Sequence, residues 1–362
     1  MPILRADAKE LAGNRHADIQ QLMHLMPGAL SSARAASTMK RYCPSWGYFK
    51  EWCADYDLSF LPAAPLTVAL YLLMLTQKAN SFSIIKMASA AIAAFHSFAS
   101  QPEVTTAPIV NAIREHAKRK LPDGVNKKEP LPWEKVEEVC KLLAERPASS
   151  GRLRNLSLAA AISLGFCGFL RYDDLSRLTV EQITVSPDLE SLEIRLGTRK
   201  NSPYRSGGDI TVTAVNGFAD PVQLVAILIR HAGLVDGSRP LFSAVTRCQG
   251  REVYGSTPIS YGCLRVAMLE VFLEVGLPKE KFGTHSMRSG GATLAANSGV
   301  PDRLWMEHGG WKSFRSAVGY VKTSKKGKGQ YHQGHVSRHL IFVALCAAPI
   351  PMLTECSLVL VA

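Results

Sequence analysis

The sequence lacks the features that would place it in several large protein classes. Its eight cysteines are scattered without any C-x-x-C pair, which predicts neither a zinc site nor a disulfide scaffold and favours reduced thiols in a cytosolic or nuclear protein. It shows no Walker A loop and no carboxylate cluster, so it indicates neither a nucleotide-driven nor a metal-dependent enzyme. The N-terminal stretch has no apolar signal-peptide core, and we expect a protein that is not secreted.

The composition describes a basic globular protein. The chain has 362 residues, 47% of them hydrophobic, which predicts two domains with real cores. Its formal net charge is +12 and its pI is near 9.4. Such an excess of lysine and arginine favours a polyanionic partner, nucleic acid ahead of an acidic membrane surface. A soluble protein that happens to be basic remains open on charge alone.

Residues 15–121 have the pattern of a small all-helical domain. Four apolar residues recur at helical spacing and predict one buried stripe: Tyr42, Trp46, Phe49 and Cys53. Pro44 interrupts the stripe and is expected to kink the helix or to move its start. Further helices are expected at 65–77, 81–99 and 107–121. Residues 122–132 are charged and rich in proline, which predicts a flexible basic linker.

Residues 133–330 predict a second, mixed domain. Segment 183–215 alternates, is rich in isoleucine, valine and threonine, and predicts a three-stranded antiparallel sheet. Helical patterns cover 133–147, 152–168, 220–232, 258–275, 285–298, 301–307 and 313–322. The expected fold class is therefore mainly α with a small antiparallel β-sheet, an all-helical N-terminal domain followed by an α+β domain.

The tail, residues 331–362, differs abruptly from what precedes it. Residues 340–362 are apolar and long enough to span a bilayer, but two prolines and Glu355 argue against a membrane anchor. A segment that packs on this chain or on a neighbour is one explanation. A C-terminus unrelated to the ancestral protein, as from altered splicing or gene prediction, is another, and the sequence leaves both open.

One set of residues in the second domain suggests chemistry. A His-x-x-Arg pair alone carries little information, because the chain contains three of them. Only the middle pair stands in a wider constellation, which comprises Arg171, Asp174, Lys200, His285, Arg288, Trp311 and Tyr320. Taken singly, Arg171 with Asp174 matches a surface ion pair, and Lys200 matches a solvated turn residue. Trp311 and Tyr320 are the kind of aromatic residues that usually belong to a core.

In order and context, this constellation resembles the tyrosine recombinases, the family of phage integrases and Xer-type resolvases. The resemblance covers about residues 40–325, including the S-T-x-x-x-Y-x-x-x-W-x-x-F-x-x-W-C pattern at 37–53. It implies a helical, SAM-like core-binding domain at 15–121 and a catalytic domain at 133–330. The phrases R-K-N-S-P-Y-R and G-G-W-K-S are most similar to the eukaryotic mobile-element branch, such as Crypton and DIRS-like elements.

The resemblance also implies a role for each matched position. Arg171 matches the first catalytic arginine, and Asp174 matches the acidic residue after it. Lys200 matches the hairpin lysine, and His285 with Arg288 matches the family's H-x-x-R. Trp311 stands where members carry histidine or tryptophan, and Tyr320 stands at the nucleophile. Phe282, Gly283 and the run Ser289-Gly290-Gly291 are looser matches, and the tail has no counterpart.

These residue types suit the attack of a tyrosine on a DNA phosphodiester. Tyr320 can keep the bond energy in a 3′-phosphotyrosine link, so neither ATP nor a metal cofactor is needed. Arg171 and Arg288 can each donate two hydrogen bonds to the phosphate, and Trp311 can donate one. Lys200 can protonate the leaving 5′-oxygen, and His285 can accept the proton of the tyrosine.

The expected partner is double-stranded DNA, bound by a homotetramer in the synaptic complex and by a monomer or weak oligomer without DNA. The expected location is the nucleus, or the cytoplasm if the protein is prokaryotic. The alternatives are a domesticated DNA-binding protein without strand transfer, a type IB topoisomerase-like enzyme and a helical protein that does not bind DNA. Candidate DNA-binding residues are Arg114, Lys118, Lys120, Lys127, Lys128, Lys312 and Arg315.

Overall fold

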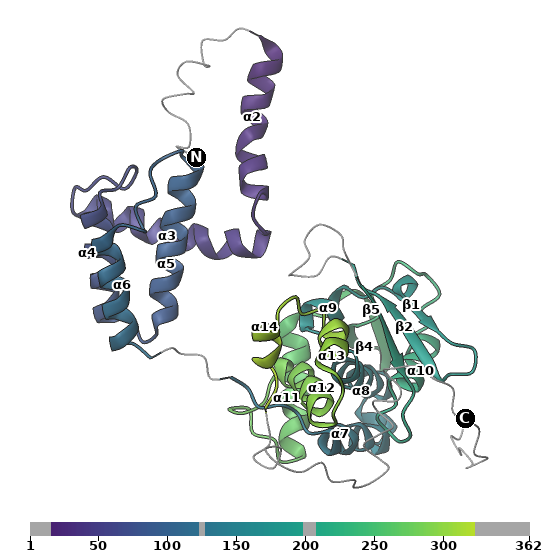
Figure 1. Ribbon diagram of the computed structural model, residues 1–362. Coiled ribbons are helices and arrows are strands. Elements are labelled where there is room, and N and C mark those ends of the chain that lie inside the picture. The colour runs from purple at the N-terminus through teal and green to yellow at the C-terminus, as the bar shows by residue number, and fades with distance from the viewer. Residues whose placement is uncertain (1–15, 123–126, 198–207, 323–362) are drawn as a thin grey trace. The chain divides into compact units, whose positions relative to one another are not determined.

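The computed structural model describes residues 16–122, 127–197 and 208–322, and the chain divides into two compact units, Met1–Asn126 and Lys127–Ala362. Figure 1 shows helices alone in the first unit and helices with strands in the second. Lys200 and the whole tail at 331–362 lie outside the described residues. Within the described ranges, no helix is long and apolar enough to cross a membrane.

The described part of the first unit is helical: α2 (Ala17–Ser32), α3 (Ala36–Asp55), α4 (Pro65–Lys78), α5 (Phe82–Phe98) and α6 (Pro108–Lys120). The stripe expected in α3 is largely buried, with Phe49 and Cys53 fully enclosed. Trp46 stacks on Phe95 of α5 with ring centroids 4.8 Å apart. Pro44 lies inside α3, which runs through it, so the proline does not move the start of the helix.

A neutral histidine holds a loop of the first unit. His96 is fully buried, its Nε2 accepts the backbone N–H of Ala63 at 3.1 Å, and its Nδ1 donates to the carbonyl of Ile92 at 2.9 Å. Because one ring nitrogen accepts and the other donates, the imidazole must be neutral in this arrangement. Burial lowers the pKa of His96 below its ordinary value, against smaller opposing effects of the hydrogen bond to Ile92 and of the Glu103 charge.

We expect the first unit to lose stability as the pH falls below about 6.5, the pKa of an unfolded histidine. Below this pH the histidine takes up a proton in the unfolded chain but stays neutral in the folded chain. The free energy of unfolding therefore falls by up to about 1.4 kcal/mol per pH unit. Hydrogen exchange of the Ala63 amide in the whole chain, corrected for intrinsic rates, measures the loss. His96→Gln is the control, because it removes the titrating group. Protection that is the same at pH 7 and pH 5 in the wild type would contradict the prediction.

Helix α8 is central among the described helices of the second unit. They are α7 (Trp133–Glu145), α8 (Arg152–Cys167), α9 (Tyr172–Arg177), α10 (Pro221–His231), α11 (Tyr261–Glu274), α12 (Thr284–Asn297), α13 (Asp302–Gly309) and α14 (Phe314–Val318), with short 3-10 turns η1 (Ala148–Ser150) and η2 (Val180–Gln182). Twelve of the sixteen residues of α8 are buried, as is typical of a helix that is apolar all round. Helix α14 ends earlier than the expected segment 313–322.

The described part of the second unit also contains two antiparallel sheets. Strands β1 (Ile183–Val185), β2 (Ser191–Arg195) and β3 (Asp209–Thr213) form the expected sheet in the order β1-β2-β3. Its register pairs Leu192 with Val212 and Ile194 with Ile210, which buries all four side chains on one face. The second sheet is a hairpin of β4 (Ser243–Cys248) and β5 (Arg251–Pro258), which was not predicted from the sequence.

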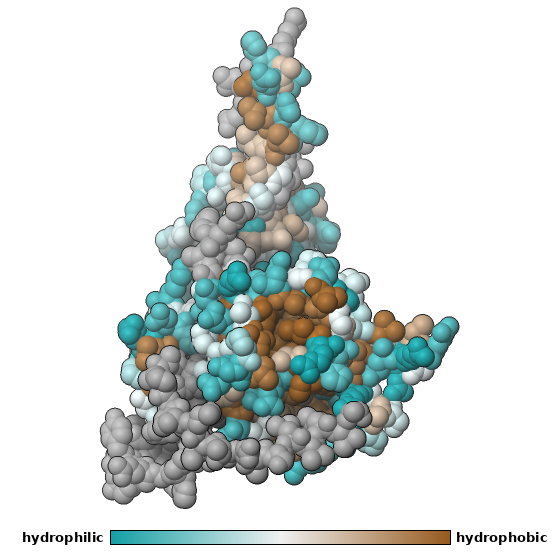
Figure 2. All heavy atoms as spheres, turned by 90° about the vertical axis from the view of Figure 1, so that its right-hand side faces the viewer, coloured by the Kyte–Doolittle hydropathy of each residue, from teal (hydrophilic) through white to brown (hydrophobic). Residues whose placement is uncertain are grey.

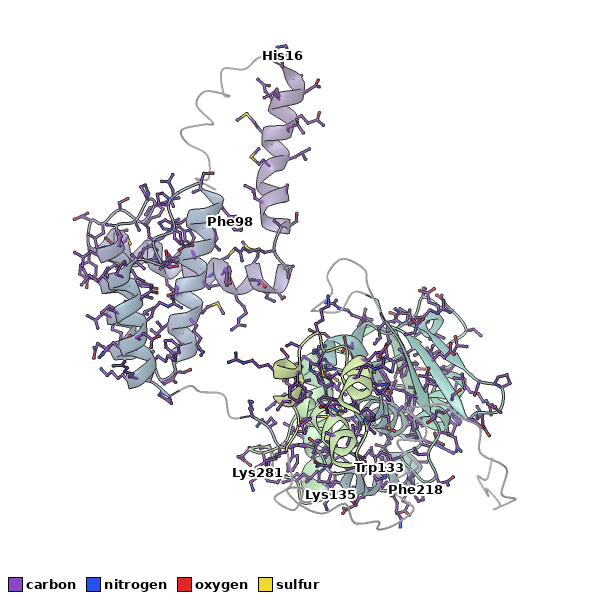
Figure 3. All side chains as sticks on the ribbon, in the orientation of Figure 1. His16, Phe98, Trp133, Lys135, Phe218 and Lys281 are labelled. Atoms are coloured by element: carbon purple, nitrogen blue, oxygen red, sulfur yellow. The ribbon has the colours of Figure 1, made fainter. Side chains whose placement is uncertain are left out.

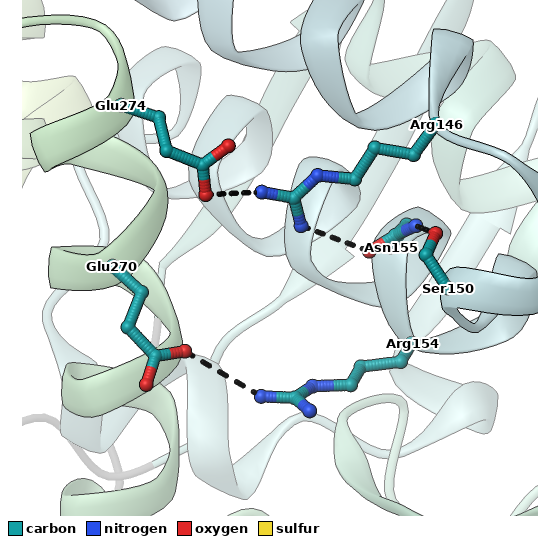
Figure 4. A network of polar contacts seen from close by, with 6 residues as sticks. All are labelled: Arg146, Ser150, Arg154, Asn155, Glu270 and Glu274. Carbon is teal, nitrogen blue, oxygen red and sulfur yellow. Dashed lines mark hydrogen bonds and ion pairs between the residues drawn. The ribbon is translucent and has the colours of Figure 1, made fainter.

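Polar contacts join the hairpin and the outer helices to α8. The Glu252 carboxylate of β5 accepts the backbone N–H groups of Leu153 at 2.8 Å and Arg154 at 3.1 Å, so it caps the start of α8. Figure 4 shows Arg146 after α7 and Arg154 of α8 reaching the glutamates of α11, the Arg154 pair with Glu270 at 3.7 Å. Such partly exposed ion pairs contribute little each, about 0–1 kcal/mol.

The second half of the expected linker is docked on the second unit. The backbone N–H of Glu129 donates to Lys281 at 2.7 Å, and that of Leu131 donates to Ser286 at 2.9 Å. The ammonium of Lys281, labelled in Figure 3, also lies 4.0 Å from the Glu129 carboxylate. Leu131 is 1% exposed, and its burial explains why residues 127–131 are not the free linker that their charge predicts.

One face of the second unit carries an apolar patch. Figure 2 views the side on which Figure 1 draws the three-stranded sheet, and apolar side chains gather there in a patch with a hydrophilic rim. The charged and aromatic candidate residues come instead from α9, α12, and the segment from α13 to Tyr320.

Candidate active site

A strained turn after α8 forms the base of the site. The helix ends at Cys167, and Phe169 takes a φ of 48°, a left-handed conformation that is costly for a bulky residue. The turn carries the chain into α9, where the Arg171 backbone N–H donates to the Asp174 carboxylate at 2.9 Å. The Arg171 guanidinium lies 3.8 Å from the same carboxylate. Asp174 therefore caps the first turn of α9 and orients the arginine.

Arg288 of α12 is the centre of the described site. Its side chain is fully buried, and it donates to the carbonyl oxygens of Phe169 and of Gly309, the latter at 2.7 Å. The guanidinium carbon lies 3.9 Å from the ring centroid of Trp311 and 5.1 Å from that of Tyr320. Carbonyl acceptors and aromatic faces together offset the cost of burying this charge.

His285 stands one turn before Arg288 on α12 but is exposed, whereas the arginine is buried. Residues three apart are separated by about 60° around the helix axis, which is enough to send one side chain inward and leave the other at the surface. The two residues therefore lie on adjacent parts of the helix surface, and only the arginine points into the core. His285 lies where a solvent-borne group can reach it.

Two glycines let α12 approach α8 closely. A Cβ added at Gly290 would lie 2.3 Å from the carbonyl oxygen of Leu131, and one added at Gly291 would lie 2.3 Å from that of Phe166. Both distances are far below van der Waals contact. This glycine pair, which follows Arg288 and Ser289, is therefore required by packing, and it sets the depth at which the arginine enters the site.

We expect Gly291→Ala to lower the free energy of unfolding by about 1–3 kcal/mol, the usual cost of overpacking a core. Gly262→Ala is the matched control, because a Cβ there meets nothing within 4 Å in the same unit. Urea unfolding of both variants gives the comparison. Equal stability of the two variants would show that α12 moves away from α8 without cost.

Trp311 closes the site from the side of α13. Gly310 ends that helix with a φ of 65°, and the Trp311 ring then packs over Gly309, where a Cβ would lie 1.9 Å from a ring atom. Trp311 is 5% exposed and contacts Phe169 and Trp305 as well as Arg288. Its indole N–H is buried and finds no hydrogen-bond acceptor among the described residues.

Tyr320 follows the short helix α14 and is half-buried. Its ring centroid lies 5.2 Å from that of Trp311. The described structure thus brings Arg288, Trp311 and Tyr320 into direct contact, while Arg171 lies two residues from the carbonyl that binds Arg288. Lys200, the remaining candidate, is outside the described residues.

Residues that the sequence analysis did not single out also shape the site. His308 donates from Nε2 to the carbonyl of Cys167 at 2.8 Å, and its ring meets Phe169 edge-on at 4.7 Å. In the sequence, its position three residues before Trp311 could have indicated that it lies near the site. Burial raises the pKa of the Cys167 thiol to about 12, so this thiol is protonated and is not a competing nucleophile.

The candidate DNA-binding cations occupy both units. On α6, Lys118 lies 3.9 Å from Glu115, and Lys120 donates to Gln77 of α4 at 2.8 Å. Arg114 of the same helix is half-buried and donates to Asn111 at 3.3 Å. In the second unit, Lys128 donates to the carbonyls of Lys279 and Glu280, so its ammonium is partly engaged by protein. Three further candidates are exposed: Lys127, Lys312 and Arg315.

Comparisons with known proteins agree on one fold. No protein-family model matches the chain. The chain is 24% identical over 305 residues to the integrase/recombinase xerD homolog of Selenomonas ruminantium, covering 81% of this chain and 83% of that protein. Its structure is similar to a lambda integrase dimer bound to a COC′ core site, with a TM-score of 0.52, 14% identity, and coverage of 91% of this chain and 87% of that one.

A second solved structure gives a similar result. It is the Tn1549 transposon integrase in complex with transposon right end DNA, with a TM-score of 0.50 and 13% identity over 88% of this chain and 94% of that one. The expected fold class is thereby confirmed: mostly helical with small antiparallel sheets, as in lambda integrase.

Proposed function

We propose that this chain is a tyrosine recombinase, a DNA integrase that cleaves and rejoins duplex DNA through a 3′-phosphotyrosine intermediate. Its fold is that of lambda integrase, and its curated relative is an integrase/recombinase. The observation that carries the proposal is the contact of Arg288, Trp311 and Tyr320 around one point. A phosphodiester at this point would meet a cation, a phenol and a buried indole N–H that has no acceptor among the described residues.

The reaction follows from these groups. The Tyr320 phenolic oxygen attacks phosphorus, a Tyr–O–P bond forms, and the bond from phosphorus to the 5′-oxygen breaks. His285, exposed one turn before Arg288, accepts the phenolic proton, and Lys200 donates a proton to the leaving 5′-oxygen. Attack by a 5′-hydroxyl on the phosphotyrosine reverses each step and rejoins the strand. No bond energy is lost between the two steps.

Three donors stabilise the phosphorane. Arg171, oriented by Asp174, and Arg288 supply permanent positive charge, and a preorganised donor of this kind contributes about 3–4 kcal/mol. The Trp311 indole, which lacks an acceptor among the described residues, donates to a phosphate oxygen. Burial of a polar N–H without a partner is costly, and a bound phosphate would remove that cost.

We further propose double-stranded DNA as the partner and a homotetramer as the synaptic form. The phrases R-K-N-S-P-Y-R and G-G-W-K-S support an origin in a eukaryotic mobile element and, with it, a nuclear location. The exposed cations Lys127, Lys312 and Arg315 support phosphate contacts by the second unit, and α6 offers Arg114, Lys118 and Lys120 in the first.

The test is the capture of a covalent adduct on nicked duplexes of randomised sequence, without ATP and in the presence of EDTA. A nick just 3′ of the cleavage position lets the short fragment that carries the free 5′-hydroxyl diffuse away, so the strand cannot be rejoined and the phosphotyrosine is trapped. We expect labelled DNA to migrate with the protein on a denaturing gel. Adducts that vanish on chelation and return with Mg²⁺ would reveal a different chemistry. DNA binding without any adduct would favour a domesticated binding protein.

A further inference from the structure

Helix α12 carries three polar side chains spaced one turn apart: Ser289, Thr293 and Asn297. Residues separated by four positions lie on one helix face, so the three form a polar ladder along α12. The face of this ladder meets the backbone that leaves α14, at residues 320–322. Ser289 and Thr293 bond to the backbone of Tyr320, and Thr293 and Asn297 bond to the backbone of Lys322.

The contacts are all between side chain and main chain. Ser289 Oγ donates to the Tyr320 carbonyl at 2.6 Å, and Thr293 Oγ1 donates to the same oxygen at 3.3 Å. The Thr293 hydroxyl also accepts the backbone N–H of Lys322 at 3.1 Å. Asn297 donates from Nδ2 to the Lys322 carbonyl at 3.4 Å. The Thr293 hydroxyl thus bridges a carbonyl and an amide two residues apart.

The ladder is strongest where it meets the tyrosine. Ser289 is 8% exposed, so its bond is shielded from water, whereas the contact of Asn297 is at the surface. Before the ladder, the turn after α14 is closed by the Tyr320 amide donating to Ala317 at 2.9 Å. Helix α14 has only five residues, and a helix that short is not stable without tertiary contacts.

The ladder and Arg288 belong to the same helix, and Ser289 is the residue after the arginine. A single rigid element therefore holds the guanidinium and the backbone of Tyr320. The ladder engages only main-chain atoms of that residue, which leaves the phenol beside Arg288 and Trp311. Small displacements of a reacting group cost large factors in rate, so a fixed backbone at this point matters for the chemistry.

We propose that Ser289, Thr293 and Asn297 are positioning residues that hold the attacking tyrosine in register with Arg288. The inference rests on the proposed function, because it assigns these residues to the cleavage step. It predicts that the hydroxyl groups of Ser289 and Thr293, rather than the shapes of these two side chains, matter for the rate of adduct formation.

The decisive variants are Thr293→Val, which keeps the shape and removes the hydroxyl, and Thr293→Ser, which keeps the hydroxyl. Ser289→Ala removes the other hydroxyl that donates to the Tyr320 carbonyl. Adduct formation on the nicked duplexes is measured as a rate against DNA concentration. Hydrogen exchange of the Lys322 amide, whose bond goes to Thr293, is followed in the same full-length proteins.

We expect Thr293→Val to speed exchange of the Lys322 amide about fivefold, the effect of one net hydrogen bond. We expect it to slow adduct formation at saturating DNA about tenfold, with the half-saturating DNA concentration unchanged, because binding is untouched and only orientation is lost. Ser289→Ala should slow the same step, and Thr293→Ser should restore both measurements.

The outcomes separate the two proposals. A wild-type chain that forms no adduct overturns the proposed function and the positioning role with it. Wild-type adducts with an unchanged or faster rate in Thr293→Val overturn the ladder alone and leave the recombinase assignment standing. A fall in rate that Thr293→Ser shares would also overturn the ladder, since it would show that side-chain shape rather than the hydroxyl is needed.

Discussion

Tyr320→Phe abolishes covalent adduct formation and leaves the affinity for DNA within about twofold of the wild type. Only the attacking oxygen is removed, since the phenylalanine ring retains the contacts with Trp311 and Arg288. The hydrogen bonds of Tyr320 within the described structure are made by its backbone, so stability should change by less than about 0.5 kcal/mol. Adducts are counted on denaturing gels, and affinity is measured by filter binding.

The control for this variant is Tyr261→Phe, the same chemical change on α11 of the same unit. Tyr261 is 48% exposed and its ring meets Tyr172, so it tests the loss of a hydroxyl outside the candidate site. We expect wild-type adduct levels from it. Adducts of wild-type strength from Tyr320→Phe would mean that another side chain is the nucleophile.

Helical periodicity was enough to predict most of the fold. The face of α5 formed by Ile85, Ala88, Ile92 and Phe95 is buried as its spacing indicates. The sheet at 183–213 followed from strict alternation of apolar and polar residues. Both signals are strong because one face of each element is core and the other is solvent.

The missed features lack such a signal. The β4–β5 hairpin is largely exposed, with Tyr254 as a rare buried residue, so its sequence alternates too weakly to predict strands. The docking of residues 127–131 was not predicted because the segment is mostly charged. Leu131 is its one large apolar residue, and a single apolar residue is too weak a signal of burial. In the site, the family resemblance grouped Arg288, Trp311 and Tyr320, which are in contact. The burial of Arg288 could not be predicted, because it depends on the turn at Phe169 and on the segment from Gly309 to Trp311, which are distant in sequence.

Arg288→Lys is expected to lower the rate of adduct formation about 10²–10³-fold, as removal of one preorganised transition-state donor does. The arginine donates to the Phe169 and Gly309 carbonyls from two ends of a planar fork while its face lies against Trp311. A lysine keeps the charge, but its single ammonium cannot reach both carbonyls and present a flat face to the indole.

The same change should also reduce stability, by about 3–5 kcal/mol, because it disrupts a fully buried charge and leaves a carbonyl unpaired. Urea unfolding and adduct rates measured at a temperature where the variant is folded separate the two effects. Arg303→Lys is the matched control, since this arginine is 81% exposed and pairs only with Glu307 among the described residues. It should match the wild type in both measurements. A stable, fully active Arg288→Lys protein would show that the buried fork neither organises the site nor acts on the phosphate.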